Sequence, residues 1–244
     1  MKNLKYSLFV TAFLLILSFN ANAQDANTIL KKMDDVMYSP KDMTGKMTII
    51  LIDKAGNQKT REATMMQKGT DKRLFRFIAP ASQAGIATLS LPNDVMYLYL
   101  PAFGKERRIS SSVKSQKFAG TDFSYDDMEA KQYSEKYIPK LLEPEADDYV
   151  LELKPKSPKS QYSKLIVRIF KTNFCPVYMG YYDKGNNKIK VATYQFEKIG
   201  KYWNAKEIEM TDLNKNHKTK MIMSNVKYDQ NLSDGEFTVR KLKQ

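Results

Sequence analysis

Few side chains in this sequence could carry a reaction. There is one histidine, His217, in a turn rich in lysine and asparagine, and one cysteine, Cys175. A single histidine and a single cysteine cannot build a zinc site of the usual kind. The sequence also lacks a Gly-x-Ser-x-Gly nucleophile motif and a glycine-rich phosphate loop. We therefore expect a protein that is not an enzyme, with no cofactor and no metal. His217 is then an exposed turn residue, and Cys175 a small buried one.

One acidic cluster contains Asp122, Asp126, Asp127 and Glu129. Carboxylates at this density could suggest calcium, but the glycine and the bidentate glutamate of an EF-hand loop are misplaced. A carboxylate at the start of a helix can instead accept hydrogen bonds from free backbone N–H groups. The sequence therefore predicts that Asp122 or Asp126 caps a short helix.

Methionine is abundant, and it indicates apolar contact. Twelve methionines remain when Met1 is left out. Their flexible thioethers fill irregular gaps in a core, and they also suit surfaces that accept variable apolar ligands. Both interpretations stay open for the methionines on expected strands. These are Met47, Met65, Met66, Met96, Met210, Met221 and Met223.

The first 23 residues are typical of an export signal. Lys2 and Lys5 precede an apolar stretch, and Ala21-Asn22-Ala23 is a site that a signal peptidase reads. We expect cleavage after Ala23 and a chain that is not lipidated there, because no cysteine follows the site. Removing Lys2 and Lys5 changes the net charge from +13 to +11. Such a surface suits an anionic membrane or an acidic protein face, whereas nucleic acid is not expected. Lysines that only maintain solubility are the alternative.

The remaining chain is expected to contain one helix and many strands. Apolar residues at helical spacing predict a helix from Asp25 to Tyr38. Beyond Pro40 the hydrophobic period changes to two, which predicts strands joined by short turns. The expected strands are Met43–Leu51, Thr60–Gln67, Lys72–Ile78, Ile86–Leu91, Val95–Leu100, Lys105–Ser110, Tyr149–Leu153, Lys164–Phe170, Val177–Asp183, Lys188–Phe196, Lys201–Thr211 and Lys218–Tyr228.

These elements predict a single mainly β (α+β) domain over residues 24–244. An antiparallel sheet of this many strands must curl. We expect one curved sheet that forms a half-open β-barrel, with the helix from Asp25 to Tyr38 as its plug. Strand parity predicts which apolar side chains point inward and line a cavity. They are Met43, Met47, Ile49, Leu51, Leu165, Val167 and Ile169.

The segment from Ser111 to Lys131 interrupts the series of strands, because it has no clean hydrophobic period. Long loops in compact domains are often functional. We expect residues 118–128 to lie at the mouth of the barrel, where exposed aromatic side chains contact a partner or cover cargo. The residues proposed for this role are Phe118, Asp122, Phe123 and Tyr125.

Several segments resemble the outer-membrane lipoprotein-sorting (LolA-like) family. They are Phe77-Ile-Ala-Pro-Ala81 with Gly85, Met96-Tyr-Leu-Tyr-Leu-Pro101, Arg107-Arg-Ile-Ser110, and Gly120-Thr-Asp-Phe-Ser-Tyr-Asp-Asp-Met128. The subfamily is similar to LolA-like proteins that often accompany RND-type exporters. The resemblance implies a LolA/LolB-like unclosed barrel with an apolar cavity for acyl chains. None of the carrier's functional residues can be matched individually.

Together these features predict a periplasmic, monomeric, non-catalytic carrier that binds the acyl chain of a lipid or lipoprotein. Burial of an acyl chain yields about 0.8 kcal/mol per CH₂, so no reactive group is needed to hold it. The alternative is an accessory subunit that docks on an inner-membrane exporter and has no cargo of its own. A cavity filled by side chains would favour that alternative.

Overall fold

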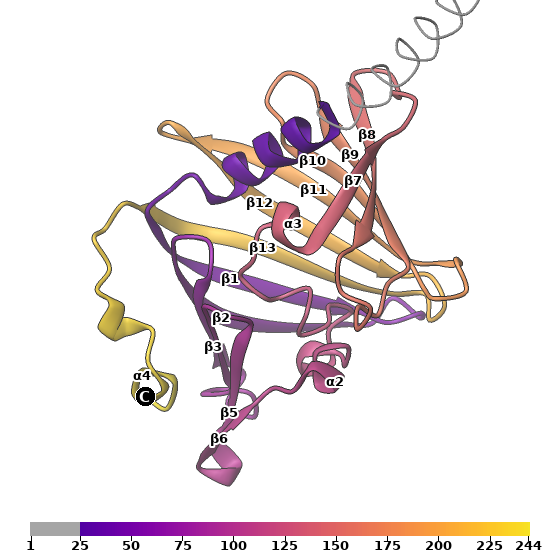
Figure 1. The fold of residues 1–244 in the computed structure, drawn as a ribbon. Coiled ribbons are helices and arrows are strands. Elements are labelled where there is room, and N and C mark those ends of the chain that lie inside the picture. The colour runs from indigo at the N-terminus through magenta and orange to yellow at the C-terminus, as the bar shows by residue number, and fades with distance from the viewer. Residues whose placement is uncertain (1–24) are drawn as a thin grey trace, which may run out of the picture.

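The computed structural model describes residues 25–244, so the expected signal peptide lies outside the described residues. The described chain forms one antiparallel sheet of 13 strands (Figure 1). The strands are β1 (Asp42–Ile52), β2 (Gln58–Lys68), β3 (Lys72–Ala79), β4 (Ala87–Leu91), β5 (Val95–Leu100), β6 (Lys105–Arg108), β7 (Tyr137–Leu141), β8 (Asp148–Pro155), β9 (Lys164–Phe170), β10 (Pro176–Tyr182), β11 (Lys188–Ile199), β12 (Tyr202–Asp212) and β13 (His217–Tyr228).

The strand order is β6-β5-β4-β3-β2-β1-β13-β12-β11-β10-β9-β8-β7. Every strand pairs with its neighbours in sequence, except where β1 pairs with β13 and where β6 and β7 remain as the two edges. The sheet therefore curls around a hollow without closing, since β6 and β7 do not pair with each other (Figure 1). The prediction of a mainly β, half-open barrel is confirmed.

Side chains alternate along the central strands as a half-buried sheet requires. In β1, Met47, Ile49 and Leu51 are buried, whereas Lys46, which points to the opposite face, is exposed. In β9 the buried side chains are those of Leu165, Val167 and Ile169. These six side chains belong to one hydrophobic core cluster, which fixes the concave face of the sheet.

The chain is helical over residues 25–38, as predicted, and this helix lies in the hollow of the sheet (Figure 1). Leu30 and Met33 are fully buried and join the core cluster of the strands. Asp34 is also buried, and its carboxylate accepts hydrogen bonds of 2.8 Å from the backbone N–H groups of Tyr133 and Ser134. The predicted plug is confirmed, and Asp34 attaches it to the start of α3 (Tyr133–Lys136).

The other helices are single turns. They are η1 (Pro101–Phe103), α2 (Ser111–Lys114), η2 (Phe118–Gly120), α3, η3 (Asp234–Glu236) and α4 (Val239–Leu242). Across residues 25–244, no helix has both the length and the apolar character needed to cross a membrane.

Two segments escaped the sequence prediction. Strand β7 is short and contains Pro139, which interrupts a strand pattern and is tolerated at a sheet edge. The C-terminal residues cover the other side of β3 and β4, where Phe237 and Leu242 form a second core cluster with Leu89. The Arg76 guanidinium fixes this tail by donating to the carbonyl oxygens of residues 241 and 242.

Candidate functional site

A cavity of about 180 Å³ lies between the helix over residues 25–38, the concave face of the sheet and the segment that precedes β7. Its lining is mostly apolar, with aromatic side chains such as Phe123, Tyr181 and Trp203. Seven of the chain's 13 methionines also line it, so we call it the methionine cavity. They are Met37, Met43, Met47, Met65, Met128, Met221 and Met223.

The methionines gather here because of strand register. Met47 of β1 lies directly opposite Met223 of β13, and Met221 lies two residues further along the same face, opposite Ile49. Met65 comes from β2 on the other side of β1. Unbranched thioether side chains have several rotatable bonds, so a wall built from them can change shape without losing apolar contact. The cavity can therefore admit apolar groups of variable shape and length.

The polar groups at the edge of the methionine cavity are paired. Asp127 accepts hydrogen bonds from the backbone N–H of Ser124 at 2.8 Å and from the Tyr162 hydroxyl at 3.1 Å. Lys136 contacts Asp126 at 2.9 Å. Across residues 25–244, every buried side-chain nitrogen and oxygen has a hydrogen-bond partner. The cavity thus offers an apolar wall without an unsatisfied buried polar side chain.

Tyrosine hydroxyls around the cavity stay protonated at neutral pH. Burial raises the pKa of Tyr133 and of Tyr181 well above the ordinary tyrosine value. Burial likewise raises the pKa of Tyr194 to about 12. These groups can therefore donate hydrogen bonds, but none is poised to act as a base.

The structure separates the residues expected to line the cavity into two sets. Met43, Met47 and Leu165 line the methionine cavity. The other four point to the same side of the sheet but lie within packed core, away from the cavity lining. They are Ile49, Leu51, Val167 and Ile169. Parity identified the inward face, and the helix and the loop determine which part of that face stays open.

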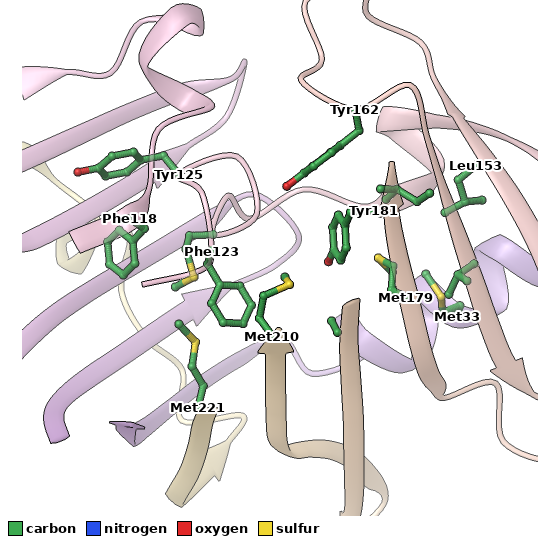
Figure 2. Packing of buried hydrophobic residues seen from close by; sticks show 14 of the residues in the cluster. Met33, Phe118, Phe123, Tyr125, Leu153, Tyr162, Met179, Tyr181, Met210 and Met221 are labelled. Carbon is green, nitrogen blue, oxygen red and sulfur yellow. The ribbon is translucent and has the colours of Figure 1, made fainter. Parts of the chain in front are cut away.

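The loop residues expected to be exposed are instead buried. Phe118 is 1% exposed and packs against Phe75, Phe77 and Tyr125, with ring centroids 5.2, 5.8 and 5.6 Å away. Phe123 is 6% exposed and lines the methionine cavity. Figure 2 shows both rings among the buried side chains of the core cluster, which also contains Met210 and Met221. The expectation of exposure is wrong because the loop runs from edge β6 to edge β7, where its aromatic side chains complete the core of an unclosed sheet.

Asp122 anchors this loop to the sheet. Its Oδ2 accepts a 2.8 Å hydrogen bond from Thr219 Oγ1 and lies 2.6 Å from His217 Nδ1. Its Oδ1 accepts from Lys117 Nζ at 2.8 Å, and Lys117 also contacts Asp212 at 3.1 Å. Burial by itself would raise the pKa of Asp122, but hydrogen bonds from Lys117, His217 and Thr219 hold that pKa below the usual 3.8.

This network corrects two sequence predictions. Neither Asp122 nor Asp126 caps a helix. Both oxygens of Asp122 bind side chains of the loop and of β13, and Asp126 Oδ1 accepts a 2.9 Å hydrogen bond from Lys136. His217 is not a free turn residue, because it begins β13 and pairs with the fully buried Asp122. Within residues 25–244, no hydroxyl or thiol hydrogen-bonds the His217 ring, so the pair lacks the nucleophile of a hydrolase triad.

The remaining candidates for chemistry are also accounted for. Cys175 is buried, as predicted, and burial raises the pKa of its thiol to about 12. The thiol therefore stays protonated at neutral pH, and a protonated thiol is a poor nucleophile. The part of the chain that the structure describes contains no group of three or more His, Cys, Asp or Glu side chains placed to hold a metal ion.

The fold matches solved structures over most of its length. A domain named as an outer membrane lipoprotein-sorting protein from Vibrio parahaemolyticus is 29% identical, with a TM-score of 0.83 over 91% of this chain and 100% of that one. A DUF1329 family protein from Desulfovibrio piger is 26% identical, with a TM-score of 0.84 over 91% and 99%. A family model described as an uncharacterized protein matches residues 69–244. The chain belongs to the family of this model, and its fold is that of LolA-like, outer-membrane lipoprotein-sorting proteins.

Two further comparisons complete this assignment. A LolA superfamily protein from Nitrosomonas europaea shares the LolA-like fold at 23% identity, with a TM-score of 0.77 over 88% of this chain and 98% of that one. No curated protein matches the sequence. These comparisons establish a LolA-like fold, and the cargo has to be inferred from the cavity itself.

Some contacts of this LolA-like chain had no signal in the sequence. Asp34 joins the helix to α3 across 99 positions, and Asp122 meets Thr219 across 97 positions. Both aspartates are fully buried, although an aspartate in a sequence is normally expected at the surface. Only the folding of the chain into a curled sheet brings their partners into reach.

Proposed function

We propose that this protein is a periplasmic, non-catalytic carrier that holds the acyl chain of a lipid or lipoprotein in the methionine cavity. The observation that carries the proposal is an open apolar cavity, lined by seven methionines, inside a LolA-like barrel. In the accessory-subunit alternative, side chains would fill this space, so the open cavity does not favour it.

The energetics of the cavity suit reversible binding. Each CH₂ group removed from water contributes about 0.8 kcal/mol, so several methylene groups already give measurable affinity. An apolar engineered cavity of about 150 Å³ is enough to bind benzene. The methionine cavity is about 180 Å³, and a longer chain would enter as the thioether side chains move aside. A carrier needs such moderate affinity, because it must also release its cargo.

Delivery to the periplasm would follow from the expected signal peptide. Residues 1–23 carry the features that a signal peptidase recognises, and these residues lie outside the described part of the structure. Intact mass measurement of periplasmic material should show a chain that starts at Gln24. Full-length protein retained in the membrane fraction would contradict this part of the proposal.

The carrier function can be tested by filling the cavity. The substitution Met47→Trp places a large side chain at the cavity wall, so it should abolish binding of a fluorescent fatty acyl probe while the protein stays folded. The matched control is Thr48→Trp, since Thr48 is the next residue of β1 and points to the opposite face. The control should bind the probe as the wild type does.

Thermal unfolding distinguishes an open cavity from a packed core. Overpacking a filled core costs about 1–3 kcal/mol, and Met47→Trp should cost less than this if the cavity is open. A wild type that binds no acyl probe, together with a strongly destabilised Met47→Trp variant, would refute the carrier function.

A further inference from the structure

A second cavity, of about 920 Å³, adjoins the methionine cavity and opens between the two unpaired edges of the sheet. One side is formed by the end of β6 and by α2, and the other by the turn after β8. We call this second cavity the edge cleft. Acyl-chain binding does not account for it, because polar and charged side chains dominate its lining.

The edge cleft carries an excess of positive charge. Six of its lining side chains are cationic and four are acidic. Three of the four carboxylates already pair with lysines of the same lining, as Glu129 with Lys114, Asp126 with Lys136, and Asp94 with Lys131. Among residues 25–244, the lining cations that contact no carboxylate are Arg108, Lys156 and Lys159. The Lys156 ammonium donates one 2.8 Å hydrogen bond to the carbonyl oxygen of Ser134, and its other N–H groups, like the Arg108 and Lys159 side chains, are available to an anion that enters from solvent.

Serine hydroxyls accompany these cations on both sides of the edge cleft. Ser110 and Ser111 follow Arg108 on one side, while Ser157 and Ser160 flank Lys159 on the other. Ammonium, guanidinium and hydroxyl groups all donate hydrogen bonds. A phosphate group has several acceptor oxygens and matches such a set of converging donors. The lining therefore favours a phosphorylated ligand over a neutral one.

The edge cleft and the methionine cavity share a wall. The residues common to both linings are Asp126, Glu129, Lys131, Lys136 and Tyr137. The wall consists largely of ion pairs between side chains, so a ligand can lie across it once these side chains shift. An amphiphile with its chain in the methionine cavity would then have its polar end on the side of the edge cleft.

We propose that the edge cleft binds the phosphorylated headgroup of an acylated ligand whose chain occupies the methionine cavity. This inference rests on the proposed carrier function and adds the chemical class of the cargo. Arg108 reaches the headgroup from the β6 edge, and Lys156 and Lys159 reach it from the opposite side. The gap in the barrel thus has a role of its own, because it places both groups of donors around one anion.

The test compares two fluorescent probes with the same acyl chain, a monoacylglycerol phosphate and the neutral monoacylglycerol. The triple variant Arg108→Gln, Lys156→Gln and Lys159→Gln should weaken binding of the phosphorylated probe at least about tenfold and leave the neutral probe almost unchanged. The control removes the same charge at exposed lysines outside both linings, through Lys59→Gln, Lys215→Gln and Lys227→Gln. This control should bind both probes as the wild type does.

The outcomes separate this inference from the carrier function. If the wild type binds both probes equally and the triple variant changes neither, the headgroup site is refuted and the carrier function stands. If the wild type binds neither probe, both are refuted. A titration with inorganic phosphate alone tests whether the edge cleft binds free phosphate and not a lipid headgroup. Phosphate binding that the triple variant loses, without any preference between the two probes, would refute the lipid headgroup in favour of free phosphate.

Discussion

Phe118 shows how a single loop residue supports the core. Its ring lies among three other aromatic rings and is almost fully buried. We expect Phe118→Ala to destabilise the fold by about 3–5 kcal/mol, because a buried ring is lost and a cavity remains. Chemical denaturation measures this loss. Phe103→Ala, at a 61% exposed position, is the control and should change stability by less than about 0.5 kcal/mol. An unchanged midpoint for Phe118→Ala would instead assign this ring to docking.

Asp122 should make stability depend on pH in the acid range. Its pKa in the folded state lies below 3.8, so its charge stabilises the fold above about pH 4 and this contribution is lost as the pH falls through the folded-state pKa. We expect Asp122→Asn to lower stability by about 1–3 kcal/mol at pH 7. The difference from the wild type should shrink as the pH falls below 3.8.

Denaturant titrations at several pH values test this prediction. Asp35→Asn is the control, since Asp35 is exposed, and it should follow the wild type at every pH. A constant difference between Asp122→Asn and the wild type from pH 7 down to strongly acidic conditions would show that the Asp122 charge does not contribute.

The strands around the cavity explain why methionine is used there. Leucine has a similar volume but fewer conformations. Each of the substitutions Met47→Leu, Met221→Leu and Met223→Leu should therefore change the free energy of unfolding by less than about 1.5 kcal/mol. We expect the affinity for a long acyl probe to fall severalfold, and that for a short one to change little. The control replaces the fully buried Met96, Met179 and Met210, which lie outside the cavity lining. Equal affinities in both triple variants would contradict a special role for the cavity methionines.

The same strands show what the sequence could predict. The alternation in β1 and β9 predicted both the strands and their inward faces, because a half-buried strand requires a period of two. Strand β7 was missed, since Pro139 breaks its short pattern. The division between cavity and packed core could not be predicted either. Met47 and Ile49 share one face, and only the position of the helix and the loop leaves space beside Met47.

The charge of the whole molecule predicts an interaction with anionic membranes. The net charge is +11 without residues 1–23, and the exposed Phe103 lies at the β5–β6 hairpin tip beside the exposed Arg107. We expect binding to anionic vesicles at low salt that weakens with added salt, because exposed charges are screened over about 8 Å at physiological ionic strength. Vesicle flotation measures this.

A variant at the hairpin tip locates the contact. Phe103→Ser should weaken flotation, whereas Leu213→Ser, which removes another exposed apolar side chain at the turn after β12, should not. If the protein does not float with anionic vesicles even at low salt, its lysines serve solubility alone.

The pairing of β1 with β13 also has a consequence for folding kinetics. Every other strand pair joins neighbours in sequence, so the strands β1–β6 and the strands β7–β13 can each form through local hairpins. The β1–β13 ladder instead pairs residues from opposite ends of the described chain, such as Met43 with Tyr228. Closing such a long loop costs entropy before any contact forms. The two halves of the sheet should therefore assemble first, with their docking along β1 and β13 as the slow step of folding.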